Sequence, residues 1–389
     1  MTPAARLQAA IEILDAVIAA ARAGGAPAER VVAEGLRARR YAGSGDRRAI
    51  REHVFAAIRA CGPVPASGRA ALLRVADRAL FDGSAHGPAP LAAGEQAADG
   101  GVAPLWLAQR LAASGLAAEA AEALLGRAAL DIRVNAARAD RAALALPVAG
   151  EALAFTRQGL RLPAGTPVEQ WEAYAQGLIE VQDAGSQLAC GVVAARPGEL
   201  VVDLCAGAGG KTLALAADMA GAGRLIACDV DRARLGRLAP RAQRAGAQGI
   251  ETRLMHPGRE MEALGDLAGA CDAVLVDAPC SGTGTWRRQP DGRWRLTEKE
   301  LARVVAIQAR LLDLAAGLVK PGGRLVFVTC SVLDEEGADQ WQRFLAAHPG
   351  WRTDTPALAI GEARGGGVRL SPQASQTDGF FIARGQSLC

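Results

Sequence analysis

From Glu199 onward, short runs of apolar, β-favouring residues alternate with longer stretches of helical pattern. The apolar runs are ELVVDL (199–204), RLIACD (224–229), AVLVDAP (273–279) and GRLVFVTCS (323–331). Helical stretches follow them at 212–220, 232–245, 298–319 and 335–347. Strands that alternate with helices at this spacing predict a doubly wound, parallel α/β sheet. Right-handed crossovers then bring the carboxyl ends of the strands to one edge, where such sheets bind ligands.

The first 81 residues have a different, purely helical pattern. Leu7, Ile11, Leu14 and Ile18 recur at spacings of three and four, as the buried face of a helix requires. Residues 1–81 hold thirteen arginines, no lysine and seven acidic residues, which gives a net charge of +6. We therefore expect an all-helical domain over 1–81, in which the arginine-rich segment 37–59 either holds phosphates or forms a solvated helix face.

The sequence between these two parts predicts two further segments. Residues 82–103 are rich in Gly, Ala, Pro and Ser without periodicity, as in a linker or a long surface loop. Residues 104–178 begin with a helical pattern and continue with short apolar runs between Gly and Pro, which predicts a small α+β module. The predicted division is 1–81, 82–103, 104–178 and 179–389.

Composition excludes several classes of protein. No apolar run approaches the length needed to cross a bilayer, and Arg6, Glu12, Asp15 and Arg22 interrupt the N-terminal apolar stretch, so we expect a cytoplasmic protein without a secretory signal. The eight cysteines contain no C-x-x-C pair, and the four histidines do not pair at metal-ligand spacing. We expect no metal, no membrane partner and a monomer.

A glycine-rich turn follows the first predicted strand in DLCAGAGGKT (203–212). Gly207, Gly209 and Gly210 allow a tight turn and a close approach of ligand to backbone, and the next helix begins there. Asp229 ends the second strand, where an acid can accept both hydroxyl groups of a ribose. The spacing does not fit a Walker A loop. A nucleoside cofactor is favoured over a plain structural turn, and both NAD and S-adenosylmethionine remain open at this point.

The next two strand ends carry an acid and two thiols. The third strand runs into Asp277-Ala-Pro279-Cys280 and the fourth into Thr329-Cys330-Ser331. A single cysteine in an apolar strand is usually an inert core residue. Two cysteines at the carboxyl ends of neighbouring strands can instead face one pocket beside the cofactor turn.

Methyl transfer to carbon 5 of a pyrimidine explains these groups, whereas hydride transfer requires none of them. Carbon 5 is a poor nucleophile until a thiolate adds to carbon 6, which is a case of covalent catalysis. An acid near ring nitrogen 3 stabilises the developing charge, and a further group removes the carbon 5 proton. One thiolate, one acid and a second thiol match that set.

These residues resemble the RsmB-like (Nop/Sun) family of RNA cytosine-5 methyltransferases. The matching segments occur in the family's order over roughly the last 200 residues: VQDAGSQLA (181–189), DLCAGAGGKT (203–212), ACDVD (227–231), VDAPCSGTGTWRR (276–288), PGGRLVFVTCS (321–331) and TDGFF (377–381). The segment PLWLAQRL…DIRVNA resembles the family's small domain that precedes the catalytic core. The segment RRYAGSGDRRAIREHVFAAIR is similar to the NusB-like helical domain of bacterial members.

The resemblance implies a role for each site residue. Cys330 would be the nucleophile, Cys280 would assist product release, and Asp277 would contact both the base and the cofactor. Asp229 would bind the ribose of S-adenosylmethionine, and Arg234 would support that site. The methionine part of the cofactor would lie along the loop formed by Cys205, Ala206, Gly207, Ala208, Gly209, Gly210 and Lys211. Where relatives have an adenine-contacting Asp, this chain has His256, which either substitutes for it or loses the contact.

The expected substrate is RNA, ribosomal in the first instance and transfer RNA as the alternative. The target cytosine must be unpaired or extruded to reach both thiols. Candidate RNA contacts are Arg39, Arg40, Arg47, Arg48, Arg287, Arg288 and Arg293, with Trp286 and Trp294 as possible stacking platforms. Two rival interpretations remain, a nicotinamide oxidoreductase and a non-catalytic RNA-binding or ribosome-assembly factor.

Overall fold

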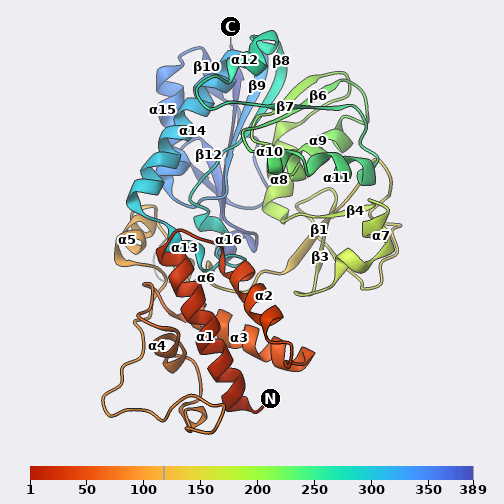
Figure 1. The fold of residues 1–389 in the computed structure, drawn as a ribbon. Helices are drawn as coiled ribbons and strands as arrows, with labels where there is room; N and C mark the ends of the chain where they lie inside the picture. The colour runs from red at the N-terminus through yellow and green to blue at the C-terminus, as the bar shows by residue number, and fades with distance from the viewer. Residues whose placement is uncertain (117–118, 389) are drawn as a thin grey trace. The chain divides into compact units, whose positions relative to one another are not determined.

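A computed structural model describes residues 1–116 and 119–388. Contacts divide the chain into two compact units, Met1–Gly126 with Thr285–Glu298, and Arg127–Gly284 with Lys299–Cys389. The four-part division predicted from the sequence stays a prediction. Each unit is described separately below, and Figure 1 shows the elements of both.

The first unit is helical and is built around one long helix. α1 (Pro3–Arg22) begins after Thr2, whose hydroxyl accepts from the Ala5 N–H, with proline at its first position. Its buried residues, Leu7, Leu14 and Ile18 among them, face a core shared with the next helices. The other helices of this unit are α2 (Ala28–Ala38), α3 (Ser44–Ala60), α4 (Gly68–Leu73), α5 (Leu105–Ala113), α6 (Glu119–Ala123) and α13 (Gly292–Arg295), with a 3₁₀ turn at Arg78–Leu80.

Residues 82–103 run along this unit without a helix or strand of their own. Arg69 forms an ion pair with Glu95 at 2.5 Å, and the Ala98 N–H donates to the Ala70 carbonyl at 2.8 Å. Leu91, Ala97 and Ala98 pack against the helical core. The segment is therefore an ordered surface loop in this structure.

The second unit opens with a small antiparallel sheet of order β2-β3-β1-β4. Its strands are β1 (Leu130–Val134), β2 (Glu151–Ala152), β3 (Gly159–Leu162) and β4 (Ile179–Val181), with the short α7 (Glu172–Ala175) before β4. Ile132, Leu160 and Trp171 belong to its own small core.

The large sheet of the second unit confirms the predicted α/β class. Its order is β11-β12-β13-β9-β8-β5-β6-β7, with β10 paired to β13, and the pairs among β9, β8, β5, β6 and β7 are parallel. The parallel strands are β5 (Leu200–Asp203), β6 (Arg224–Asp229), β7 (Ile250–Leu254), β8 (Cys271–Asp277) and β9 (Val319–Thr329). The antiparallel strands are β10 (Trp351–Thr353), β11 (Glu362–Arg364), β12 (Gly367–Leu370) and β13 (Phe380–Ser387).

Helices cover both faces of this sheet, which explains its nearly continuous apolar strands. Along β8, Val274 and Val276 join one core cluster, and Ala273 and Leu275 join the other. The first cluster includes residues of α12 (Met261–Leu264), α14 (Glu298–Leu318) and α15 (Ala338–Ala347), and the second includes residues of α8 (Ala184–Val193) and α9 (Gly210–Asp218). Alternate side chains of a strand point to opposite faces, so both sets are buried.

Two features differ from the sequence prediction. The expected single helix over 232–245 is two helices, α10 (Arg232–Leu235) and α11 (Leu238–Ala245). Pro240 has no backbone N–H to donate to a preceding turn, so it fits only near the start of a new helix. The antiparallel strands β10–β13 lay outside the predicted alternation, and the C-terminal part of the sheet reverses direction there.

Among the described residues, no helix combines the length and the hydropathy that a membrane crossing requires. α16 (Pro372–Ser375) is a single short turn between β12 and β13.

Candidate active site

The carboxyl ends of four neighbouring strands bring the predicted acids and a thiol to one edge of the large sheet. β5 ends at Asp203, β6 at Asp229 and β8 at Asp277, and Cys330 directly follows β9. These strands are adjacent and parallel in the order β9-β8-β5-β6. The edge at which an open α/β sheet binds ligands therefore carries three carboxyl groups and a thiol.

The loop after β5 turns on glycines that a side chain would obstruct. Gly207 has φ +56° and Gly209 φ +84°, a region that favours glycine. A Cβ at Gly209 would lie 2.1 Å from Leu238 Cδ1, and one at Gly207 would lie 2.5 Å from Arg234 Nη2. α9 begins at Gly210, so its first N–H groups open toward this loop.

Asp229 holds the glycine loop through its carboxylate. Its Oδ2 accepts from the Gly207 N–H and its Oδ1 from the Asp231 N–H, both at 2.7 Å. Each carboxylate oxygen can accept a further hydrogen bond, so capacity for two ribose hydroxyl groups remains. Arg234, exposed on α10, has its guanidinium over Gly207 and carries no ion pair in the described part of the chain.

Lys211 and Asp277 connect the glycine loop to the end of β8. Lys211 Nζ donates to Asp277 Oδ2 at 2.7 Å and lies 5.7 Å from the ring centroid of Phe380. Burial lowers the pKa of Lys211, but the negative charge of Asp277 and its hydrogen bond with Lys211 raise the pKa overall. The ammonium is thus protonated at neutral pH.

Cys280 and Cys330 face each other across the loops that follow β8 and β9. Their Sγ atoms are 3.1 Å apart, and both side chains are partly exposed. The hydrogen bond with Cys330, together with burial, raises the pKa of the Cys280 thiol well above 9.0. Cys280 is therefore protonated at neutral pH. By contrast, four other cysteines are buried: Cys61, Cys190, Cys228 and Cys271.

This site can be compared with known proteins through its sequence. Residues 191–386 match the family model described as 16S rRNA methyltransferase RsmB/F. This chain belongs to the RsmB/F family. The match covers both thiol loops and the glycine loop, so the family predicted from the sequence is confirmed.

Curated relatives and a solved structure agree with this assignment. Ribosomal RNA small subunit methyltransferase B of Erwinia tasmaniensis is 38% identical over 237 residues, which cover 60% of this chain and 53% of that protein. A Synechocystis protein named Probable ribosomal RNA small subunit methyltransferase B is 36% identical over 268 residues, covering 65% of this chain and 59% of its own length. This chain therefore spans between half and two thirds of these relatives.

The solved structure of a methyltransferase homolog from Pyrococcus horikoshii has a TM-score of 0.62 at 25% identity. The superposition covers 73% of this chain and 100% of that one. The α/β fold of the RsmB/F chain is therefore a methyltransferase fold.

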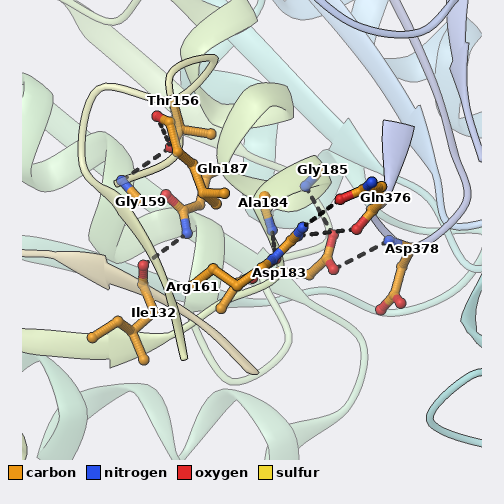
Figure 2. Close-up of polar contacts among 12 residues, drawn as sticks. Ile132, Thr156, Gly159, Arg161, Asp183, Ala184, Gly185, Gln187, Gln376 and Asp378 are labelled. Carbon is orange, nitrogen blue, oxygen red and sulfur yellow. Dashed lines mark hydrogen bonds and ion pairs between the residues drawn. The ribbon is translucent and has the colours of Figure 1, made fainter. Parts of the chain in front are cut away.

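Two of the RsmB/F-like motifs, VQDAGSQLA and TDGFF, meet at Asp183 (Figure 2). Asp183 Oδ1 accepts from the Gly185 N–H at 2.8 Å, which caps α8, and Oδ2 accepts from the Asp378 N–H at 3.1 Å. β13 begins two residues later at Phe380, whose ring lies near Lys211. The Asp183 carboxylate thus helps to place one wall of the site.

A second set of contacts joins the small sheet to the same motifs (Figure 2). Arg161 Nε donates to Asp131 Oδ1 at 2.7 Å, and its Nη2 donates to the Gln376 carbonyl at 3.0 Å. Asp131 Oδ2 also accepts from the Ala184 N–H at 3.1 Å. The small sheet therefore braces α8 and the chain leading into β13.

Sequence reasoning missed a pair of arginines behind the glycine loop. Arg241 on α11 donates to the Ala208 carbonyl at 2.7 Å and to Glu180 at 2.9 Å, and Arg244 donates to the other oxygen of Glu180 at 2.5 Å. Glu180 is only 3% exposed. No local signal marks these residues, because their partners lie 33 to 64 positions away in the sequence.

Four of the arginines expected at RNA lie on or near α3. Arg40, Arg47 and Arg48 are exposed, whereas Arg39 is partly buried and pairs with Glu12. Arg40 and Arg48 have no ion pair within residues 1–116 and 119–388, so they remain candidates for phosphate contacts.

The arginines after Cys280 occupy different environments. Arg288 is exposed and Arg287 is 9% exposed, but Arg293 is fully buried. Arg293 donates to the carbonyl of Cys61 at 2.9 Å and to that of Ile58 within the helical unit. A guanidinium so enclosed cannot reach a phosphate in this structure. The prediction that Arg293 contacts RNA is therefore contradicted by its burial.

The two tryptophans expected to stack on bases are also buried. Trp286 is 1% exposed, and Trp294 is 5% exposed and packs in the core of the helical unit. The Trp294 indole N–H donates to the Cys61 carbonyl at 3.2 Å. Both rings therefore serve packing in this structure rather than base stacking.

His256 is exposed just beyond the end of β7, at the same edge of the sheet as Asp229. Its replacement of an adenine-contacting Asp stays a prediction. Within the described residues, no group of three or more His, Cys, Asp or Glu could hold a metal ion.

Proposed function

We propose that this chain uses S-adenosylmethionine to methylate carbon 5 of a cytosine in RNA, with Cys330 as the nucleophile. The observation that carries the proposal is the 3.1 Å separation of the Cys280 and Cys330 sulfurs beside the Lys211–Asp277 pair. The RsmB/F family description favours 16S ribosomal RNA as the substrate.

The residues of the glycine loop fit this cofactor. Gly207 and Gly209 let the loop turn tightly where Arg234 and Leu238 leave no room for a Cβ, and Asp229 offers carboxylate oxygens to a ribose. Arg234 lies over the loop, where it can pair with a carboxylate of the ligand. S-adenosylmethionine, when bound, supplies an electrophilic methyl group. The residues that would hold it are those predicted from the sequence, 205–211 with Asp229, Arg234 and Asp277.

Cys330 and the ion pair would activate the base together. The Cys330 thiolate forms a bond to carbon 6, and the electron pair of the 5–6 double bond makes carbon 5 nucleophilic. The negative charge that develops on the ring can be stabilised by the protonated Lys211, which Asp277 holds in place.

Cys280 would complete the cycle after carbon 5 has been methylated. It is protonated at neutral pH and adjoins the Cys330 sulfur, so it can donate its proton to that sulfur as the carbon–sulfur bond breaks. The Cys280 thiolate formed in this way can accept the proton that carbon 5 loses. Cys280 is then a thiol again, and Cys330 must release its newly gained proton to solvent to become the thiolate of the next cycle, so the proton lost by carbon 5 leaves the site.

Methylation of RNA by the purified chain tests the proposal. Wild type, Cys330→Ser and Cys61→Ala proteins are incubated with ribosomal and transfer RNA and S-adenosylmethionine, and 5-methylcytosine is measured by mass spectrometry of nucleosides. We expect product with wild type and with Cys61→Ala, which alters a buried cysteine of the helical unit. We expect none with Cys330→Ser.

The same proteins also distinguish the rival interpretations, by methylation, thermal stability and RNA binding. Product on transfer RNA alone would change the substrate and keep the chemistry. Thermal stabilisation by NAD rather than by S-adenosylmethionine would indicate an oxidoreductase. RNA binding without 5-methylcytosine from any RNA would indicate a non-catalytic factor.

A further inference from the structure

A fully buried carboxylate lies behind the two thiol loops. Glu336 follows β9 in a 3₁₀ turn (Asp334–Glu336) before α15, and its side chain is 0% exposed. No cation contacts it among the described residues. Burial of a charged carboxylate is unfavourable unless hydrogen bonds compensate for the lost water. The groups that donate hydrogen bonds to Glu336 therefore indicate its structural role.

The first partner of Glu336 is the residue that follows Cys280. The Ser281 N–H donates to Glu336 Oε1 at 2.8 Å, and the Ser281 hydroxyl donates to Oε2. Both bonds restrain the backbone directly attached to the Cys280 carbonyl, so Glu336 fixes the loop that carries this thiol.

The second partner is the residue that follows Cys330. The Ser331 hydroxyl donates to Glu336 Oε2 at 2.6 Å and accepts from the Leu333 N–H at 3.1 Å. Ser331 is itself 0% exposed. One carboxylate thus holds both P-C-S and T-C-S loops by the serine adjacent to each cysteine.

Gln308 on α14 completes the arrangement. Its Nε2 donates to Glu336 Oε1 at 3.1 Å and to the carbonyl of Pro279 at 2.9 Å, so the residue before Cys280 is held as well. The Glu336 carboxylate therefore receives four hydrogen bonds, which is enough to satisfy a buried charge.

We propose that Glu336 is a positioning residue that sets the separation of the Cys280 and Cys330 sulfurs for the transfer reaction. The inference rests on the proposed function and adds to it a residue that touches neither substrate nor cofactor. The negative charge of Glu336 also acts in the direction that raises the pKa of Cys280, after the larger effects of Cys330 and burial.

The rate at which Cys280 and Cys330 form a disulfide reports on the separation of their sulfur atoms, and it does not depend on methyl transfer. Diamide accepts two electrons and two protons from the Cys280 and Cys330 thiols, which become a disulfide while diamide becomes the hydrazine. The rate is followed by mass spectrometry of the linked peptides in wild type, Glu336→Gln, Glu336→Ala and Asp339→Asn. Asp339→Asn is the matched control, because it removes an exposed carboxylate from the first turn of α15.

For Glu336→Ala we expect slower formation of this disulfide and a fall in kcat of about 100-fold, since small misplacements of reacting groups have effects of this order. The KM for RNA and the Kd for S-adenosylmethionine should stay within about threefold of wild type, because Glu336 contacts neither ligand. Glu336→Gln, which keeps one carbonyl acceptor, should recover part of both rates, and Asp339→Asn should match wild type.

Equal disulfide and methylation rates in wild type and Glu336→Ala would overturn the inference. If disulfide formation depends on Glu336 but wild type methylates no RNA, the proposed function fails and the positioning role stands. If Glu336→Ala does not fold, the double variant Ser281→Ala, Ser331→Ala removes two of the four donors, the two hydroxyl groups, with a smaller change in volume. Wild-type disulfide and methylation rates in that double variant would also overturn the inference.

Discussion

Lys211 and Asp277 form an ion pair of 2.7 Å that joins the start of α9 to the end of β8. The side chains are 11% and 30% exposed, so solvent screens the pair only partly. Asp277 lies three residues before Cys280, and Lys211 ends the glycine loop. The glycine loop and the strand that leads into the Cys280 loop are therefore linked through this charged contact.

Lys211→Met should impair both chemistry and stability. It leaves the Asp277 carboxylate without its partner, which costs about 1–3 kcal/mol of unfolding free energy. Loss of a positioned cation beside the base should lower kcat/KM by roughly 10²–10³-fold. Urea unfolding and methylation kinetics measure the two effects. Activity equal to wild type would remove Lys211 from the mechanism.

Asp229→Ala should weaken cofactor binding. The variant removes the acceptor of the Gly207 N–H and the proposed acceptor for ribose, and hydrogen bonds to charged groups are worth about 1.5–3 kcal/mol. We expect the Kd for S-adenosylmethionine, measured by calorimetry, to rise about 10–100-fold. Asp231→Asn is the control, because Asn caps a helix about as well as Asp and α10 should be preserved. An unchanged Kd in Asp229→Ala would exclude Asp229 from the cofactor site.

Asp203 makes the stability of the second unit depend on pH. Burial raises its pKa from 3.8 to about 7, and Thr212 donates to its Oδ2 at 2.7 Å. Between about pH 4 and pH 7 the folded state therefore keeps a proton that the unfolded state has lost. The stabilisation from this group is complete below pH 4 and is lost as the pH rises to 7.

Comparison with Asp203→Asn isolates this effect, since the amide keeps an acceptor for Thr212 but does not titrate. The unfolding free energy of wild type, measured in urea between pH 4.5 and 7.5, should fall relative to that of the variant as the pH rises. Parallel curves for the two proteins would show that Asp203 has an ordinary pKa.

Arg293 and Arg48 should respond differently to substitution. Arg293→Ala removes the guanidinium donor from the buried carbonyl of Ile58 and leaves that of Cys61 with the Trp294 indole N–H, and it should destabilise the helical unit by about 2–4 kcal/mol. Arg48→Ala, at an exposed position, should change stability by less than about 0.5 kcal/mol.

RNA binding gives the complementary measurement. If Arg48 contacts a phosphate, Arg48→Ala should reduce the slope of log Kd against log salt by about 0.7–0.9. An unchanged slope would mean that this arginine is part of a solvated face. A large loss of stability in Arg48→Ala, or none in Arg293→Ala, would contradict the assigned burial.

The sequence predicted the position of those candidate site residues that end a parallel strand, because the direction of the chain fixes the edge at which they lie. Asp203, Asp229, Asp277 and Cys330 end consecutive apolar runs, and parallel strands must bring such ends to one edge. The contact between Cys280 and Cys330 follows from the adjacency of β8 and β9, which the alternation of strands and helices made predictable.

Other features depend on contacts between distant residues, and no local pattern reveals them. In sequence the Glu336 carboxylate resembles its partly exposed neighbours in the acidic run DEE, and only its partners at Ser281 and Gln308 distinguish it. Arg293 and Trp294 suggested an RNA surface because arginine and tryptophan are common there, but tertiary packing buries both. The antiparallel strands likewise depend on pairing between distant residues, whereas the break before Pro240 had a local signal, the proline itself.

The most direct test of the thiol mechanism is a covalent complex between protein and RNA. Cys280→Ala protein is incubated with RNA and S-adenosylmethionine, and the mixture is separated in denaturant, with Cys61→Ala as a matched control. We predict that a denaturant-resistant adduct accumulates with Cys280→Ala and disappears in the double variant Cys280→Ala, Cys330→Ala. An adduct that persists without Cys330, or 5-methylcytosine formed by Cys330→Ala, would contradict the assignment of Cys330 as the nucleophile.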